Sequence, residues 1–161
     1  MSLIHLKLII DTFSHSKYSY ICQMKTYLFL DDFRIPTDCV NYMSLRTNDP
    51  AMYSRESWII VRKYDDFVDY ITHNGLPDLI SFDHDLADEH YDQSLYLTNY
   101  DDLSKSFKEK TGMDCAKWLV DYCLDNNKNL PKFVVHSMNP VGTKNITSYL
   151  EDFRKFQNFE I

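Results

Sequence analysis

Three apolar segments, 27–30, 79–82 and 133–135, each run directly into ionisable or hydrogen-bonding side chains. The polar residues that follow them are, in chain order, Asp31, Asp32, Arg34, Asp83, His84, Asp85, His136, Ser137 and Asn139. Because a buried strand has no structural need for such an ending, these groups are candidates for chemistry. We expect the three strand ends to meet at one site.

Carboxylate oxygens are the ligands that a hard divalent cation prefers. Asp31, Asp32 and Asp83 can together hold Mg²⁺, which is usually bound through one or two carboxylates, several waters and a substrate phosphate. The structural alternative is that each acid caps the turn after its strand. We interpret the three acids as a magnesium site.

Histidine titrates near neutral pH, so two imidazoles can share proton transfer during attack on a phosphorus centre. We predict that His84 and His136 form such a catalytic pair, with Asp83 beside them. The alternative is that each histidine is a structural residue at a strand end. The pair requires both side chains to lie on the same side of the sheet. Asp85 either orients a histidine or caps the following segment.

Three further polar residues are suited to positioning a phosphate. Arg34 can clamp it bidentately, although a surface ion pair is the alternative. Ser137 can donate a hydrogen bond to a phosphoryl oxygen or act as a nucleophile, and the lack of a nucleophile-elbow pattern favours the first. Asn139 precedes Pro140, which predicts a helix N-terminus and therefore an anion site as well as a plain cap.

The elements that must position these residues alternate between strands and helices. Apolar runs predict strands at 26–30, 58–62, 79–82 and 132–135, and helical spacing predicts helices at 38–45, 64–74, after Thr111 and after Asn139. This order predicts an α/β fold with a mostly parallel central sheet of four to five strands and helices on both faces. In such sheets the carboxyl ends of the strands form the binding crevice.

Composition limits the classes of protein and partner. The chain of 161 residues is most simply one domain, and its net charge of -7 disfavours binding to duplex DNA. No run approaches the roughly 20 apolar residues of a membrane span, and the four cysteines lack a disulfide or metal spacing. We therefore expect an intracellular, cytoplasmic protein with reduced thiols.

Two segments stand apart from the alternating elements. Residues 1–23 read as an N-terminal extension, either an extra edge strand at 3–10 or a loosely attached piece, and Met24 is a natural alternative start. Residues 87–109 are polar and rich in tyrosine, and they exceed the two to about six residues usual for a strand-to-helix connection. We expect this second segment to be a lid whose tyrosines stack on a base.

Four motifs together resemble the receiver-like family described as cyclic-phosphate processing, which is frequent in phages. They are Leu30-Asp-Asp-Phe-Arg-Ile-Pro36, Ser81-Phe-Asp-His-Asp-Leu86, Cys115-Ala-Lys-Trp-Leu119 and Val135-His-Ser-Met-Asn-Pro-Val-Gly142-Thr-Lys-Asn145. The resemblance covers about Met24 to Phe153. It implies a divergent response-regulator receiver fold, three-layered and flavodoxin-like, that processes cyclic phosphates arising in RNA repair or nucleotide signalling.

The resemblance also implies roles for individual residues. Asp83 corresponds to the receiver's phosphoacceptor, Asp31 and Asp32 to its metal-binding acids, and Ser137 to its hydroxyl. The sequence lacks a clear fifth strand ending in the receiver's lysine, which disfavours a conventional phospho-aspartate switch.

These observations predict a phosphoesterase-like enzyme that opens or hydrolyses a cyclic phosphate on a nucleotide-derived or ADP-ribose-derived small molecule or on an RNA end. Its ligand is then a small phosphorylated or cyclic-phosphate compound, and its compartment is the host cytoplasm if the protein is viral. Two alternatives remain. The chain is either a non-catalytic receiver-like signalling or nucleotide-binding module, or a viral protein that engages a host partner.

Overall fold

The computed structural model describes residues 25–86 and 110–159. The expected extension at 1–23 and the expected lid at 87–109 both lie outside these residues. Within the described ranges no helix is both long and apolar enough to cross a membrane.

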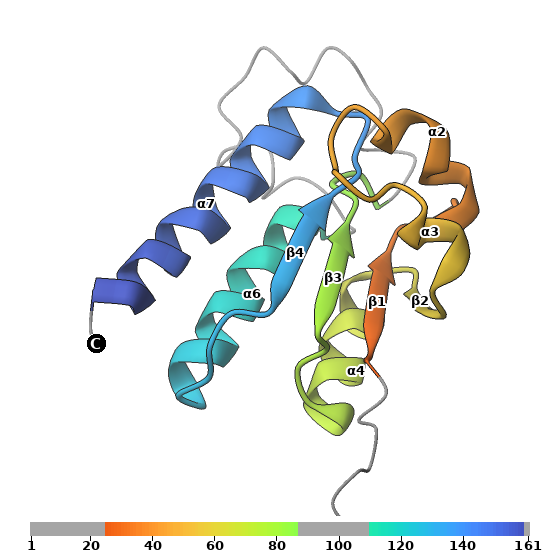
Figure 1. The fold of residues 1–161 in the computed structure, drawn as a ribbon. Coiled ribbons are helices and arrows are strands. Elements are labelled where there is room, and N and C mark those ends of the chain that lie inside the picture. Colours follow the sequence, from red (N-terminus) through yellow and green to blue (C-terminus); the bar gives the residue numbers. More distant parts are fainter. Residues whose placement is uncertain (1–24, 87–109, 160–161) are drawn as a thin grey trace, which may run out of the picture.

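Four parallel strands form one sheet. They are β1 (Tyr27–Leu30), β2 (Trp58–Val61), β3 (Leu79–Phe82) and β4 (Lys132–Val135), in the spatial order β2-β1-β3-β4 (Figure 1). The order reverses between β1 and β3, as in flavodoxin-like sheets, where ligands bind at this point. The predicted α/β receiver-like fold is therefore confirmed, and the part of the chain that is described contains no fifth strand.

Helices cover both faces of the sheet and make the fold three-layered. The smaller layer consists of the 3₁₀ helix η1 (Pro36–Cys39), α2 (Val40–Met43) and α3 (Met52–Arg55). The larger layer consists of α4 (Tyr64–Asn74), α6 (Gly112–Asp125) and α7 (Pro140–Phe159). The single short helix expected at 38–45 is thus two pieces, η1 and α2, that follow one another directly.

Alternation along the strands divides the core in two. Leu28 and Leu30 of β1 belong to the larger cluster, under α4, α6 and α7, whereas Phe29 belongs to the smaller one with Met43 and Tyr53. Side chains of a strand alternate between faces, so the side chain two residues beyond Phe29 points toward the smaller layer. That residue is Asp31, the first of the polar strand ends.

Side-chain caps fix the starts of the two helices nearest the site. Asp114 Oδ2 accepts a hydrogen bond of 2.9 Å from the Thr111 amide at the start of α6. Asn139 Oδ1 accepts one of 2.9 Å from the Gly142 amide at the start of α7. Both predicted caps are confirmed, and both helices direct their N-termini toward the carboxyl end of the sheet (Figure 1).

Candidate functional site

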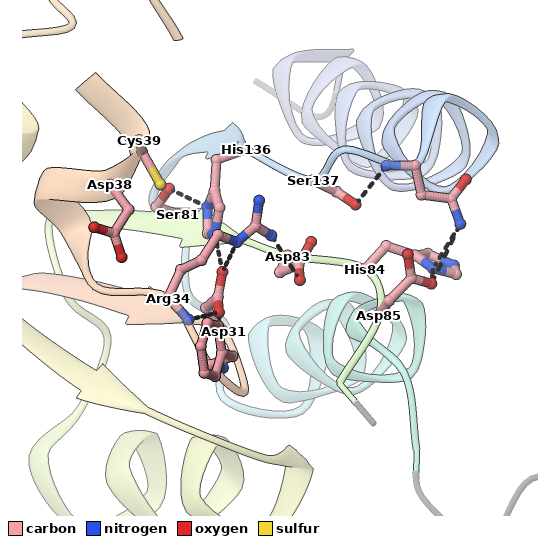
Figure 2. A network of polar contacts seen from close by, with 12 residues as sticks. Asp31, Arg34, Asp38, Cys39, Ser81, Asp83, His84, Asp85, His136 and Ser137 are labelled. Carbon is pink, nitrogen blue, oxygen red and sulfur yellow. Dashed lines mark hydrogen bonds and ion pairs between the residues drawn. The ribbon is translucent and has the colours of Figure 1, made fainter. Parts of the chain in front are cut away.

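Arg34 lies between the carboxylates of β1 and β3. Its Nε is 2.7 Å from Asp31 Oδ2, and its Nη2 is 2.9 Å from Asp83 Oδ2 (Figure 2). The third nitrogen, Nη1, donates to the Tyr42 hydroxyl at 3.0 Å. Burial disfavours a charged guanidinium, but Asp83 and Asp31 outweigh it and raise the pKa of Arg34. Arg34 is therefore a permanent cation inside the acidic site.

Asp31 is fully buried and accepts four hydrogen bonds. Oδ1 accepts from the backbone amides of Phe33 and Arg34, which folds the turn after β1 around this carboxylate. Burial raises the pKa of Asp31, but the hydrogen bond from His136 and the charge of Arg34 outweigh it and hold that pKa below its usual value. Asp31 is thus ionised at neutral pH.

The pKa of Asp83 is shifted in the opposite direction to that of Asp31. Burial raises the pKa of Asp83 despite the favourable charges of His136 and Arg34 and a hydrogen bond from the Ser137 side chain. Ser137 is itself buried, and its Oγ also accepts from the Asn139 amide at 3.1 Å. The acid and the hydroxyl that were expected at this edge of the sheet therefore lie together.

His136 belongs to a buried chain of hydrogen bonds. Its Nε2 is 3.0 Å from Asp31 Oδ2, and its Nδ1 is 2.7 Å from Ser81 Oγ, which in turn is 2.8 Å from the Tyr53 hydroxyl. The imidazole also stacks on Phe29, with ring centroids 4.3 Å apart and an interplanar angle of 11°. His136 has no exposed surface, so it reaches the site through Asp31.

Charge decides the direction of each hydrogen bond in this chain. Burial lowers the pKa of His136, although Asp31 and Asp83 oppose the shift, so the imidazole is neutral at pH 7. An ionised Asp31 only accepts, so His136 Nε2 donates to it and Nδ1 accepts from Ser81. Ser81 then accepts from Tyr53.

His84 belongs to a different group of side chains. Its Nδ1 is 2.7 Å from Asp85 Oδ1, and that oxygen also accepts from Asn139 Nδ2 at 3.2 Å. Asp85 therefore orients the imidazole, one of the two roles left open for it, and Asn139 links this pair to the start of α7. The hydrogen bond to Asp85 engages Nδ1 of the His84 ring.

The structure does not bring the two imidazoles together. Phe82 pairs with Val135, so Asp83 is level with His136, and both turn toward the smaller helical layer. His84 lies one residue further and turns toward α7, and Figure 2 shows Asp83 between the two histidines. The condition that both share one side of the sheet is not met.

Two glycines allow the helices to approach the end of β3. A Cβ added at Gly142 would lie 2.2 Å from the His84 ring, and one added at Gly112 would lie 1.8 Å from the Asp83 carbonyl oxygen. The Gly112 amide donates to the His84 carbonyl at 2.8 Å. Close packing of both helix starts against residues 83 and 84 therefore depends on these glycines.

The residues fit a metal ion, but not in the set that the sequence suggested. Asp31, Asp83 and His136 each offer a ligand atom within 4.8 Å of the others and can hold an ion. Asp32 is outside this group. Within the described ranges, however, its buried Oδ1 has no hydrogen-bond partner. Burial and the charges of Asp31 and Asp83 raise the pKa of Asp32 to about 6. A carboxylate with an orphaned oxygen in an acidic cluster fits a nearby cation.

A small cavity opens beside these groups. It measures about 220 Å³ and is lined by Phe33, Arg34, Asp83, Asp85 and Met138. Three of its lining residues, Arg34, Asp83 and Asp85, are ionisable. The other two, Phe33 and Met138, are apolar and lie in the turns after β1 and β4. We call Arg34 with Asp31 and Asp83 the Arg34 bridge, and His84 with Asp85 the His84 pair. The cavity is lined by Arg34 and Asp83 of the first group and by Asp85 of the second.

Sequence reasoning missed several contributors. Ser81 and Tyr53 complete the hydrogen-bond chain of His136, and Arg62 Nη1 donates to the carbonyls of Asp31 and Arg34 at 2.9 and 2.6 Å. Arg46 donates to the Ser137 carbonyl from residues beyond α2. A buried serine inside an otherwise apolar strand was the one signal available for Ser81.

Comparisons with known proteins point to one family. The family model described as "Cyclic-phosphate processing Receiver domain" matches residues 26–152, which is most of the chain. Neither the curated proteins nor the solved structures contain a match.

Proposed function

The chain belongs to the cyclic-phosphate processing receiver domain family, and from this premise we propose that it is a phosphoesterase-like enzyme. Its proposed substrate is a cyclic phosphate on a nucleotide-derived or ADP-ribose-derived small molecule or on an RNA end. Its proposed reaction is ring opening by water, which gives a linear monophosphate.

The observation that carries this proposal is the His84 and Asp85 pair, joined at 2.7 Å beside the acidic cluster. A receiver that acts only as a switch needs an acid, a cation and a hydroxyl, but no imidazole held by a carboxylate. Asp85, the carboxylate that orients this imidazole, lines the same cavity as Arg34 and Asp83. An imidazole held by a carboxylate beside that cavity supports proton transfer to or from a reacting oxygen.

The proposed roles follow from the contacts. Water attacks the phosphorus, one ring P–O bond breaks, and the proton of the water passes to His84 Nε2. The leaving ribose oxygen takes up a proton from solvent, and His84 then returns its proton to solvent. Arg34, whose two donors now serve Asp31 and Asp83, positions the phosphate, with Ser137 and the amides at the start of α7 beside it. His136 holds Asp31 in place.

The acidic cluster supports participation of a divalent cation, and we propose Mg²⁺. Asp31 and Asp83 would hold it, with the orphaned oxygen of Asp32 beside them. When bound, such an ion neutralises phosphate charge and lowers the pKa of a coordinated water.

The test is incubation with 2′,3′-cyclic nucleotides and with ADP-ribose 1″,2″-cyclic phosphate, with and without Mg²⁺, followed by ³¹P NMR. We expect a linear monophosphate from at least one of these. His84→Gln should lower the rate about 10²- to 10⁴-fold, the usual contribution of a general acid or base. The matched control is His73→Gln, because His73 is an exposed histidine on α4 whose ring contacts the Asp69 carbonyl. Equal rates for the wild type and His84→Gln would refute the assignment.

One observation favours a second function, that of a phosphate-responsive signalling module. Asp83 and Ser137 lie together at the positions that correspond to the receiver's acid and hydroxyl. Labelling of Asp83 by acetyl phosphate, in a protein inert toward every cyclic phosphate, would support this function in place of hydrolysis.

A further inference from the structure

Two exposed apolar side chains flank the charged floor of the cavity. Phe33 is 85 % exposed and Met138 is 62 % exposed, yet both line the same cavity as Arg34 and Asp83. Large apolar side chains at such exposure are commonly explained by a ligand or partner when they gather at one site. Neither residue is needed by the proton or phosphate chemistry described above.

Hydrogen bonds fix the backbone of the two turns that carry these side chains. Phe33 follows β1, and its amide donates to Asp31 Oδ1 at 2.9 Å. Met138 follows β4, in a turn closed by the Asn139 amide and Ser137 Oγ at 3.1 Å. Because buried polar groups fix the backbone of both turns, a ligand would have to order only the two side chains and not the turns themselves.

The sheet order places these turns on either side of Asp83. Strands β1 and β4 are the two neighbours of β3, so the turn with Phe33 and the turn with Met138 flank the end of β3. A ligand whose charged end meets Arg34 on the floor would therefore pass between an aromatic ring and a thioether. Both groups suit a flat, uncharged ring, because aromatic faces stack on bases and sulfur contacts aromatic rings favourably.

We propose that Phe33 and Met138 form a base clamp, which selects cyclic phosphates that carry a nucleobase over those that do not. This inference rests on the proposed function for the position of the phosphate and adds the substrate class. It assigns the specificity of the site to the turns after β1 and β4.

The test compares a five-membered cyclic phosphate that carries a nucleoside with one that carries neither ribose ring nor base. Binding of 2′,3′-cyclic AMP and of glycerol 1,2-cyclic phosphate is measured by calorimetry in the His84→Gln background, where turnover is suppressed. We expect Phe33→Ala and Met138→Ala each to weaken binding of the nucleotide about 5- to 150-fold, the range of base stacking, and to leave the glycerol compound unchanged. Phe33→Trp should retain the affinity.

The matched control is Leu45→Ala, which removes a side chain 93 % exposed and outside the cavity. It should change neither affinity. The clamp is refuted if Phe33→Ala weakens both ligands equally, if it weakens neither, or if the parent binds no cyclic nucleotide. Full nucleotide affinity in Phe33→Ala would instead favour the view that Phe33 and Met138 form a docking surface for another protein.

The two proposals fail separately. If the wild type binds 2′,3′-cyclic AMP through Phe33 but never converts it, the base clamp stands and the phosphoesterase proposal is refuted. A chain that converts both ligands equally well, with or without Phe33, retains the phosphoesterase and loses the clamp.

Discussion

Nη2 of Arg34 lies 2.9 Å from Oδ2 of Asp83, so the acidic site contains a cation that belongs to the protein. The same guanidinium contacts Asp31, and these two carboxylates are also members of the group able to hold a metal. A divalent cation and Arg34 therefore compete for the same oxygens. Entry of the ion would release the guanidinium from at least one carboxylate and leave it available to a phosphate.

Replacing Arg34 should destabilise the protein by leaving two buried carboxylates without their cation. We expect Arg34→Gln to lower the free energy of unfolding by about 2 kcal/mol at pH 8, less than the ~3 to 5 of a fully buried pair because Arg34 is partly exposed. Mg²⁺ should restore part of the loss. Urea unfolding measures both effects.

The control for that experiment is Arg55→Gln. Arg55 also contacts two acids, Asp49 and Glu56, but at the surface, where solvent screens the pairs. Its replacement should change stability little and should not respond to Mg²⁺. An equal loss of unfolding free energy in Arg34→Gln and Arg55→Gln would show that the ion pairs of Arg34 stabilise the protein no more than surface ion pairs do.

The raised pKa of Asp32 predicts how stability depends on pH without divalent cations. The pKa of Asp32 is about 6 in the folded protein, against an ordinary value of 3.8, so ionisation of Asp32 costs stability as pH rises through that interval. Asp32→Asn should therefore match the wild type below pH 4 and exceed it above pH 6.

Above pH 6 the free energy of unfolding of Asp32→Asn should exceed that of the wild type by about 1 kcal/mol. Two pKa units correspond to ~2.7 kcal/mol, and solvent screens a half-buried group. Thermal unfolding in EDTA from pH 3.5 to 8 measures it. Added Mg²⁺ at pH 8 should stabilise the wild type more than the variant. A gain that is the same at every pH would contradict the assignment.

The hydrogen-bond chain of His136 contains the hydroxyls of Ser81 and Tyr53. Removing the first should lower the free energy of unfolding more than removing the second. Ser81→Ala leaves both His136 Nδ1 and the Tyr53 hydroxyl without partners, at about 2 to 4 kcal/mol in all. Tyr53→Phe removes only the outer donor and should cost about 1 kcal/mol, because Ser81 still donates to His136. Chemical denaturation of both variants tests the order.

A surface serine gives the comparison for these hydroxyls. Ser44 Oγ donates to the Asn41 carbonyl at an exposed site, and Ser44→Ala should cost less than about 0.5 kcal/mol. If Tyr53→Phe proved as costly as Ser81→Ala, the direction of donation assigned to the chain would be wrong.

The glycines beside β3 predict that one methyl group is enough to disturb the site. Gly142→Ala should displace His84 and cost about 1 to 3 kcal/mol, the usual range for overpacking, together with most of the turnover. Gly112→Ala should cost more, because the contact is with a backbone oxygen that cannot rotate away. Thermal unfolding and turnover are measured together.

Gly75→Ala separates backbone strain from damage to the site. Gly75 ends α4 at a φ of 82°, with open space around it, so an alanine there is strained by roughly 1 to 2 kcal/mol without a clash. It should lose stability but keep turnover. Retained turnover in Gly142→Ala would mean that His84 is not required where the structure places it.

The strands and their polar ends could be predicted from the sequence because they depend on local pattern. The apolar runs gave β3 and β4 at their observed bounds, and the capping residues Thr111 and Asn139 gave the starts of α6 and α7. Parallel pairing then required all the strand ends to lie at one edge of the sheet.

The contacts among those ends could not be predicted in the same way, because they depend on turn geometry and packing. Arg34 reaches Asp83 only because the turn is folded around Asp31. Tyr53 lies in a region of weak pattern and enters the site by packing on Phe29. His84 lies one residue further along its strand end than His136, so the two side chains point to different sides of the sheet. The sequence alone does not give this register between β3 and β4.

The hydrogen bond between Asp31 and His136 joins residues 105 positions apart in the chain. Strand β4 reaches β1 only through β3, so this contact needs every intervening crossover to be complete. During synthesis Asp31 emerges early, and the imidazole that holds it emerges 105 residues later. Asp31 therefore gains this partner only when β1, β3 and β4 have assembled.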